Sequence, residues 1–146
     1  MKGKHLFLGV AAAIVVFIVV GLAGYYLLPS RLSYEETEAQ YKALIGRLYT
    51  ETMKLQYAAR TKNLLSLTST AAEVKNNLED IKKDTESLQK VADPAFQESL
   101  SHFNKALEYY IKACEEIMKY NPNVAYGLIK FGTDEINKAA ETMPKK

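Results

Sequence analysis

Histidine and cysteine, the side chains that most often bind metals or attack substrates, are scarce in this sequence. The histidines are His5 and His102, and neither a Glu-x-x-His nor a His-x-x-x-His pattern surrounds His102. Helical metal sites need such ligands on the inward faces of several helices. The residues therefore predict no metal, no cofactor and no catalytic set, and we expect the chain not to be an enzyme.

Cys114 is the single cysteine, so it cannot form a disulfide within the chain. It falls between Tyr110 and Ile117 on an apolar stripe, which predicts a buried core residue. The neighbouring Glu115 and Glu116 would raise the pKa of the thiol and oppose a nucleophilic role. The alternative is a disulfide between two copies of the chain in an oxidising compartment.

Three polar residues at predicted inward positions could line a ligand pocket between helices: Thr52, Thr85 and Tyr110. Small-molecule sites combine apolar walls with a few polar groups of this kind. A sensor normally has a second membrane span to carry its signal, and no second apolar run in this chain reaches ten residues. The three residues are therefore candidates for binding without signalling by this chain alone.

The elements that would position these residues follow an apolar run at residues 6–28. This run of 23 residues contains no charge, proline or amide. As a helix it would measure roughly 34 Å, enough to cross a hydrocarbon core of about 30 Å. Basic and tyrosine side chains favour the membrane–water interface. Five such residues flank the run and form the predicted membrane-interface set: Lys2, Lys4, Tyr25, Tyr26 and Arg31.

The same run can be interpreted as a cleaved leader. Secretory signals have a shorter apolar region followed by a small-residue cleavage site, and Gly21 and Ala23 fit such a site. The apolar residues at 25–28 continue past it, so we favour an uncut anchor over cleavage after Ala23.

The short basic leader Met1-Lys2-Gly3, followed by a long apolar helix, resembles the layout of type IV pilin-like subunits. The resemblance covers the first 30 residues. It implies trimming after Gly3 and packing of the apolar helices into a filament. Leu8 stands where those proteins usually carry a glutamate, and the expected head has no strands, whereas typical pilin heads contain a sheet.

Charge predicts both the partners and the orientation of the chain. From Ser33 onward there are 16 basic and 17 acidic residues with interspersed signs. A sequence with this balance of charges does not predict the basic patch that binds nucleic acid, so no nucleic-acid partner is expected. The basic excess at the amino terminus predicts a single-pass protein of the cell membrane. Its N-terminus would be cytoplasmic and its C-terminal domain extracytoplasmic, with membrane lipid contacting residues 6–28.

Past the anchor, apolar residues recur at steps of three and four, as amphipathic helices require. Ser33 and Glu36 predict a capping box that opens the first helix. A second apolar stripe is out of phase with the first, which places a turn within 61–70. The inward stripe of the first helix is predicted to run through Tyr34, Tyr41, Ile45, Leu48, Thr52, Leu55 and Ala59.

Two further helix starts are marked by a capping residue followed by proline. They are Asp93-Pro94 and Asn121-Pro122. In the last helix, Gly132 followed by Thr133 predicts a kink or a close approach of a neighbouring helix.

Four amphipathic helices joined by short turns cover one another's stripes as an antiparallel bundle. The predicted fold class is therefore all-α, with an N-terminal single transmembrane helix followed by an up-down four-helix bundle. The alternative is one long helix over 34–91 with two shorter helices packed on it. The predicted parts are a cytoplasmic basic flank (1–5), a transmembrane anchor (6–28), a linker (29–33), an extracytoplasmic helical bundle (34–143) and a tail (144–146).

These features predict a membrane-anchored extracytoplasmic bundle that acts as a non-catalytic interaction or scaffold module. Its partner would be an unknown protein or a second copy of the chain. The alternatives are a ligand-binding, sensor-like bundle, a pilin-like filament subunit, and a secreted bundle released by cleavage.

Overall fold

The computed structural model describes residues 30–145. The predicted basic flank and anchor at 1–28, with Lys2, Lys4, Tyr25 and Tyr26, lie outside this range. Within the described range, no helix is both long enough and apolar enough to cross a bilayer.

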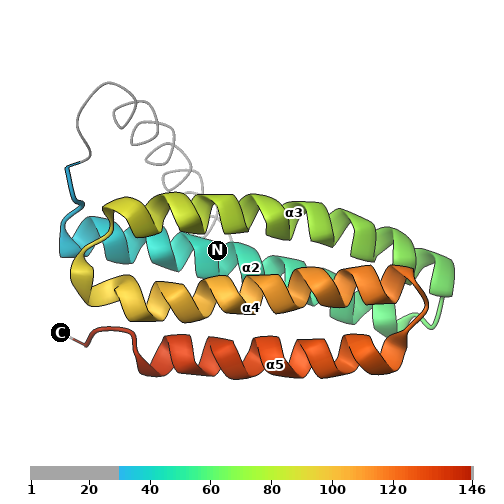
Figure 1. The fold of residues 1–146 in the computed structure, drawn as a ribbon. Helices are drawn as coiled ribbons and strands as arrows, with labels where there is room; N and C mark the ends of the chain where they lie inside the picture. Colours follow the sequence, from blue (N-terminus) through green and yellow to red (C-terminus); the bar gives the residue numbers. More distant parts are fainter. Residues whose placement is uncertain (1–29, 146) are drawn as a thin grey trace, which may run out of the picture.

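The described part is all-helical, with four helices packed together (Figure 1). Successive helices run in opposite directions, and the start of the first lies at the same end as the C-terminus. α3 packs against α2 and α4, and α4 packs against α5, whereas α2 and α5 do not pack against each other to a comparable extent. The elements are α2 (Tyr34–Arg60), α3 (Leu64–Val91), the short 3₁₀ helix η1 (Pro94–Phe96), α4 (Gln97–Met118) and α5 (Pro122–Glu141).

The starts of α2 and η1 follow the predicted capping chemistry. The Ser33 side chain accepts a hydrogen bond from the Glu36 amide at 3.3 Å, and the Glu36 carboxylate accepts from the Ser33 amide at 2.8 Å. This reciprocal pair satisfies amide groups that have no partner within the helix. Asp93 likewise accepts from the Ala95 amide at 2.9 Å, ahead of η1. These two predicted caps are confirmed, whereas Asn121 precedes Pro122 at the start of α5 as predicted but its side chain makes no capping hydrogen bond.

The alternative of one long helix over 34–91 is wrong, because the chain turns between Arg60 and Leu64. Lys62 adopts the left-handed region with a φ of 53°. Asn63 then caps α3 by accepting from the Ser66 amide at 3.1 Å. The turn lies within the predicted interval 61–70, and polar side chains form it without glycine or proline.

The predicted kink in the last helix is also wrong, because α5 continues from Pro122 to Glu141. The Thr133 hydroxyl donates to the Ile129 carbonyl at 2.9 Å within the helix, so it does not cap a new one. Gly132 instead permits a close approach. A Cβ atom there would lie 2.9 Å from Cε1 of Tyr110.

The core is aromatic near the end of the bundle where α2 begins. Tyr41 packs edge-on against Phe96 and Phe103, with ring centroids 6.4 and 5.4 Å apart. All three are almost fully buried. Each buried aromatic ring contributes on the order of 1.5–3 kcal/mol through its apolar area. This cluster fixes α2 and η1 against α4.

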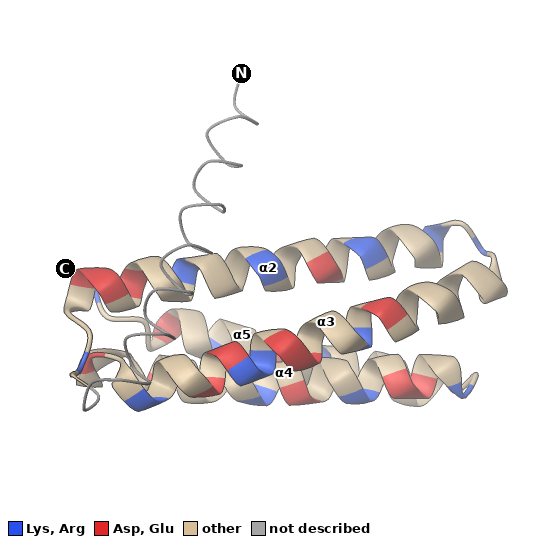
Figure 2. Ribbon diagram, turned by 90° about the horizontal axis from the view of Figure 1, so that it is seen from above, with Lys and Arg blue, Asp and Glu red and all other residues tan. Residues whose placement is uncertain are grey.

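Charged residues of both signs alternate along the helices (Figure 2). Lys82 of α3 pairs with Glu86 at 2.7 Å and with Glu108 of α4 at 3.6 Å. Arg47 of α2 pairs with Asp84 of α3. Such partly exposed pairs contribute at most about 1 kcal/mol each, so apolar packing dominates the stability of the bundle.

Candidate functional site

The side of the bundle between α2 and α5 is open, and an apolar groove runs along it. Two cavities in line, of about 290 and 380 Å³, make up this groove. The first lies toward Met143 and the second toward Pro122. Both are lined by Thr52 and Tyr110, which mark the point where they meet. We call them the Met143 compartment and the Pro122 compartment of the α2–α5 groove.

The α2 wall of the groove contains most of the stripe that the sequence predicted to face the core. Ile45 is 37% exposed, and Thr52 is only partly buried. The residues of α2 that are buried lie mostly one position before those of the predicted stripe, because α3 covers that side of the helix. They include Thr37, Gln40 and Leu44. The prediction that the whole stripe is core is therefore wrong. The groove-lining residues of α2 include Ile45, Leu48, Thr52, Leu55, Gln56 and Ala59.

The α5 wall presents a matching apolar stripe with regular steps of three and four. A helix with this spacing keeps the whole row on one face. Two residues on the rims of the groove are strongly exposed, Tyr49 of α2 at 65% and Tyr126 of α5 at 73%. The groove-lining residues of α5 include Tyr126, Ile129, Thr133, Ile136, Ala140 and Met143.

Tyr110 of α4 forms the floor where the two compartments meet. Its hydroxyl lies 3.2 Å from the Thr133 hydroxyl. Because Thr133 gives its own hydrogen to the Ile129 carbonyl, Tyr110 is the donor of this bond. Burial raises the pKa of Tyr110, and the bond to Thr133 opposes the shift only in part. The hydroxyl is therefore a neutral donor already engaged with α5.

None of the described residues that line either compartment carries a charge. The polar groups of the lining are hydroxyls and one amide, including those of Thr52, Tyr110, Thr133 and Gln56. An ionised ligand would lose its hydration here without gaining a partner of opposite charge, which is costly. The groove therefore suits an uncharged, apolar occupant.

Of the three residues predicted from the sequence to line a ligand pocket, the structure places two in the groove and one in the core. Thr52 and Tyr110 both line the groove. Thr85 does not belong to it: the side chain is fully buried within the bundle, and its hydroxyl donates to the Ile81 carbonyl at 2.8 Å. Its polar group is used inside its own helix, as happens to threonine in helix interiors. Arg31 is exposed beside the start of α2.

Cys114 is fully buried, so the hypothesis of a disulfide between chains finds no exposed sulfur in the packed bundle. Burial raises the pKa of the thiol to about 12, with Lys75 opposing the shift and Glu115 adding to it. A thiol that stays protonated is a poor nucleophile.

A buried polar chain ties α2, α4 and α5 together beside the Met143 compartment. The Ser99 hydroxyl donates to the Ala139 carbonyl at 2.6 Å, which leaves the Tyr41 hydroxyl to donate to Ser99 Oγ at 2.8 Å. Burial raises the pKa of Tyr41 to about 12, so this donor stays protonated. These hydrogen bonds hold α2 and α5 to α4, while the groove between α2 and α5 stays open.

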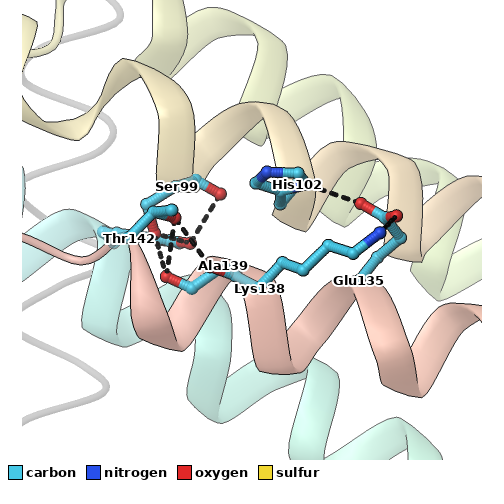
Figure 3. Close-up of polar contacts among 7 residues, drawn as sticks. Ser99, His102, Glu135, Lys138, Ala139 and Thr142 are labelled. Atoms are coloured by element: carbon cyan, nitrogen blue, oxygen red, sulfur yellow. Dashed lines mark hydrogen bonds and ion pairs between the residues drawn. The ribbon is translucent and has the colours of Figure 1, made fainter.

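A second contact between α4 and α5, made by His102, was missed by the sequence reasoning. The His102 Nδ1 lies 2.6 Å from the Glu135 carboxylate, which also accepts from Lys138 at 2.8 Å (Figure 3). The His102 and Glu135 side chains are only 20% and 12% exposed. Lys138 and then His102 lower the pKa of Glu135. The separation of 33 residues between the partners left no local signal in the sequence.

No cluster of three or more potential metal ligands occurs among residues 30–145. Comparison with known proteins finds no match among family models, curated proteins or solved structures. The geometry of the candidate site is that of an uncharged groove.

Proposed function

We propose that this chain is a membrane-tethered, non-catalytic binding module whose α2–α5 groove takes up an uncharged, apolar ligand. The observation that carries the proposal is the pair of apolar compartments that meet at Thr52 and Tyr110, between two helices that pack against α3 and α4 far more than against each other. Its volume is in the range of known small-ligand sites, and its lining combines apolar walls with a few hydroxyls.

The tether is the apolar run at residues 6–28, with an uncut, cytoplasmic N-terminus and the bundle on the far side of the membrane. The length of the run and the tyrosines at 25 and 26 support a span, and the positions of Lys2 and Lys4 support its orientation. Cleavage after Ala23 or Gly3 would give a secreted or a pilin-like chain. Residues 30–145 contain no strand, so they offer no support for a pilin-like head with a sheet.

A second candidate function is the scaffold role, in which a protein or a second copy docks across the groove. The exposed aromatic rims favour it, because large exposed apolar patches often mark protein contacts. Tyr57 is a further strongly exposed aromatic residue of α2, at 75% exposure.

One labelling experiment tests the tether and the groove together. The full-length chain, reconstituted in lipid nanodiscs, is irradiated with a small neutral aryl diazirine, and the modified peptides are mapped by mass spectrometry. We expect modification of residues 6–28 and, separately, of groove residues on α2 and α5. Labelling of the outer face of α3 at the same level as the groove would contradict a specific site. Absence of residues 1–23 from the purified native chain would contradict the tether.

A further inference from the structure

The dimensions of the groove limit what it can hold. The Met143 compartment extends from Ile136 to Met143, roughly 10 Å at the helical rise, and the Pro122 compartment from Pro122 to Thr133, roughly 16 Å. Their volumes of about 290 and 380 Å³ then give a mean cross-section of roughly 25 Å². A helix with side chains is about 10–12 Å wide and needs roughly 80–110 Å². A partner helix would therefore rest on the rims, whereas a hydrocarbon chain can lie inside.

We propose that the α2–α5 groove takes up one acyl chain of a membrane phospholipid. The headgroup stays outside, because no charged residue lines the groove to receive a phosphate or an amine. A flexible methylene chain follows both compartments past the shared residues Thr52 and Tyr110. The apolar walls of the groove leave water when such a chain covers them, which favours uptake of the chain without any polar contact.

The position of the Met143 compartment supports a bilayer source for the chain. The Tyr34 hydroxyl donates to the Pro144 carbonyl at 3.1 Å, so the start of α2 meets the C-terminal tail at the Met143 end of the groove. The Leu32 amide donates to the Val91 carbonyl at 2.7 Å and holds the linker on the same end. This step rests on the proposed function, because it needs residues 6–28 to span the membrane. The five-residue linker at 29–33 then keeps this end within roughly 18 Å of the lipid.

An entry point lies on the rims of the Met143 compartment. Ile45 of α2 and Ala140 of α5 both line this compartment and both are exposed. A large side chain at position 140 would fill the space between the two helices. Asn76 of α3 is also exposed, and it does not line the groove. It offers a matched control position for the same substitution.

The test uses the full-length chain in nanodiscs that contain phosphatidylcholine with a diazirine at the end of one acyl chain. After irradiation, we expect modification of α2 and α5 residues of the groove as well as of residues 6–28. Ala140→Trp should reduce the groove modification by about tenfold or more, since the ring occupies the compartment, whereas Asn76→Trp should leave it unchanged. Thermal unfolding of both variants shows whether they remain folded.

A second probe keeps the proposal falsifiable if Ala140→Trp fails to fold. Phosphatidylcholine with the diazirine on its headgroup should modify the linker or the rims and leave the interior residues Leu48 and Ile136 unmodified. Equal modification of these interior residues by both lipids would overturn the proposal. So would acyl-chain modification confined to residues 6–28, or modification of the groove by a free fatty acid carrying the diazirine but not by the phospholipid.

The outcomes also separate this inference from the proposed function. If the small neutral diazirine modifies the groove and the phospholipid does not, the groove binds an apolar ligand other than a lipid acyl chain. If neither probe reaches the groove while residues 6–28 are modified, the tether stands and both binding proposals fail.

Discussion

At the scale of single residues, the floor of the groove depends on a position where only glycine fits. Gly132 brings the backbone of α5 against the Tyr110 ring, and the Tyr110 hydroxyl then reaches Thr133. The sequence singled out Gly132 correctly for close helix approach but also predicted a kink. The pattern did not distinguish the two, because Thr133 can serve as a cap or bond within the helix.

The substitution Gly132→Ala should destabilise the bundle by about 1–3 kcal/mol, because the added Cβ lies 2.9 Å from Tyr110 Cε1 and forces the buried ring to move. Gly127→Ala on the same helix is the matched control, since nothing lies within 4 Å of its added Cβ. It should be neutral or stabilising by up to about 1 kcal/mol, from helix propensity. Thermal unfolding followed by circular dichroism measures both, and equal effects would contradict the close contact.

The Glu135 carboxylate should make stability depend on acid pH. Lys138 and His102 lower its pKa in the folded protein below the usual 4.5, so the unfolded chain binds the proton more readily. The stabilisation is therefore complete above the ordinary pKa and is lost as the pH falls through the lowered one. Melting temperatures of the wild type and of Glu135→Gln should differ at neutral pH and converge as the pH falls through the lowered pKa of Glu135. Glu141→Gln, which removes an exposed carboxylate of α5, should not change the pH profile in this way; a constant difference for Glu135→Gln would contradict the prediction.

At the scale of helices, the caps and boundaries could be predicted from short motifs, whereas the face of α2 could not. The Ser33–Glu36 box and the Asp93 cap are local chemistry, so the sequence is sufficient for them. The three–four pattern identified an apolar stripe at Ile45, Leu48 and Thr52 but not the helix that would cover it. In the structure α3 covers the adjacent face, and the stripe lines the groove. The apolar pattern placed Thr52 and Tyr110 on inward faces. That both line the same groove depends on the register of α2 against α4, which the sequence does not give.

The turn between α2 and α3 should accept glycine with a gain in stability. Lys62 has a φ of 53°, a conformation that costs a residue with a Cβ about 1–2 kcal/mol. Lys62→Gly should therefore stabilise the protein by about 0.5–1 kcal/mol, after the greater entropy of glycine in the unfolded chain is subtracted. Lys62→Ala removes the same charge without relieving the backbone and serves as the control. Denaturant unfolding of the pair measures the difference, and equal midpoints would contradict it.

At the scale of the whole molecule, three helix–helix interfaces hold the bundle while the fourth side stays open. The contacts between α2 and α3, α3 and α4, and α4 and α5 lie within residues 30–145. So does the aromatic cluster of Tyr41, Phe96 and Phe103. The described part therefore contains the packing that an independent domain needs.

We expect residues 30–146, expressed without the apolar run, to fold into a helical bundle with a single cooperative transition. Its helical content by circular dichroism should correspond to the four helices, and the Cys114 thiol should react with an exposed-thiol reagent only after denaturant is added, because it is fully buried. A broad transition together with rapid thiol reaction would show that the bundle needs the preceding residues for its packing.

The contact between the Tyr34 hydroxyl and the Pro144 carbonyl brings the two ends of the described chain to one pole of the molecule. A pulling force applied between these ends would therefore act across the helices rather than along them. It would peel α2 and α5 away from the interior one turn at a time, with only a few contacts resisting at any moment. Mechanically, the fold would open like a zipper at low force, even though we expect its thermal unfolding to be cooperative.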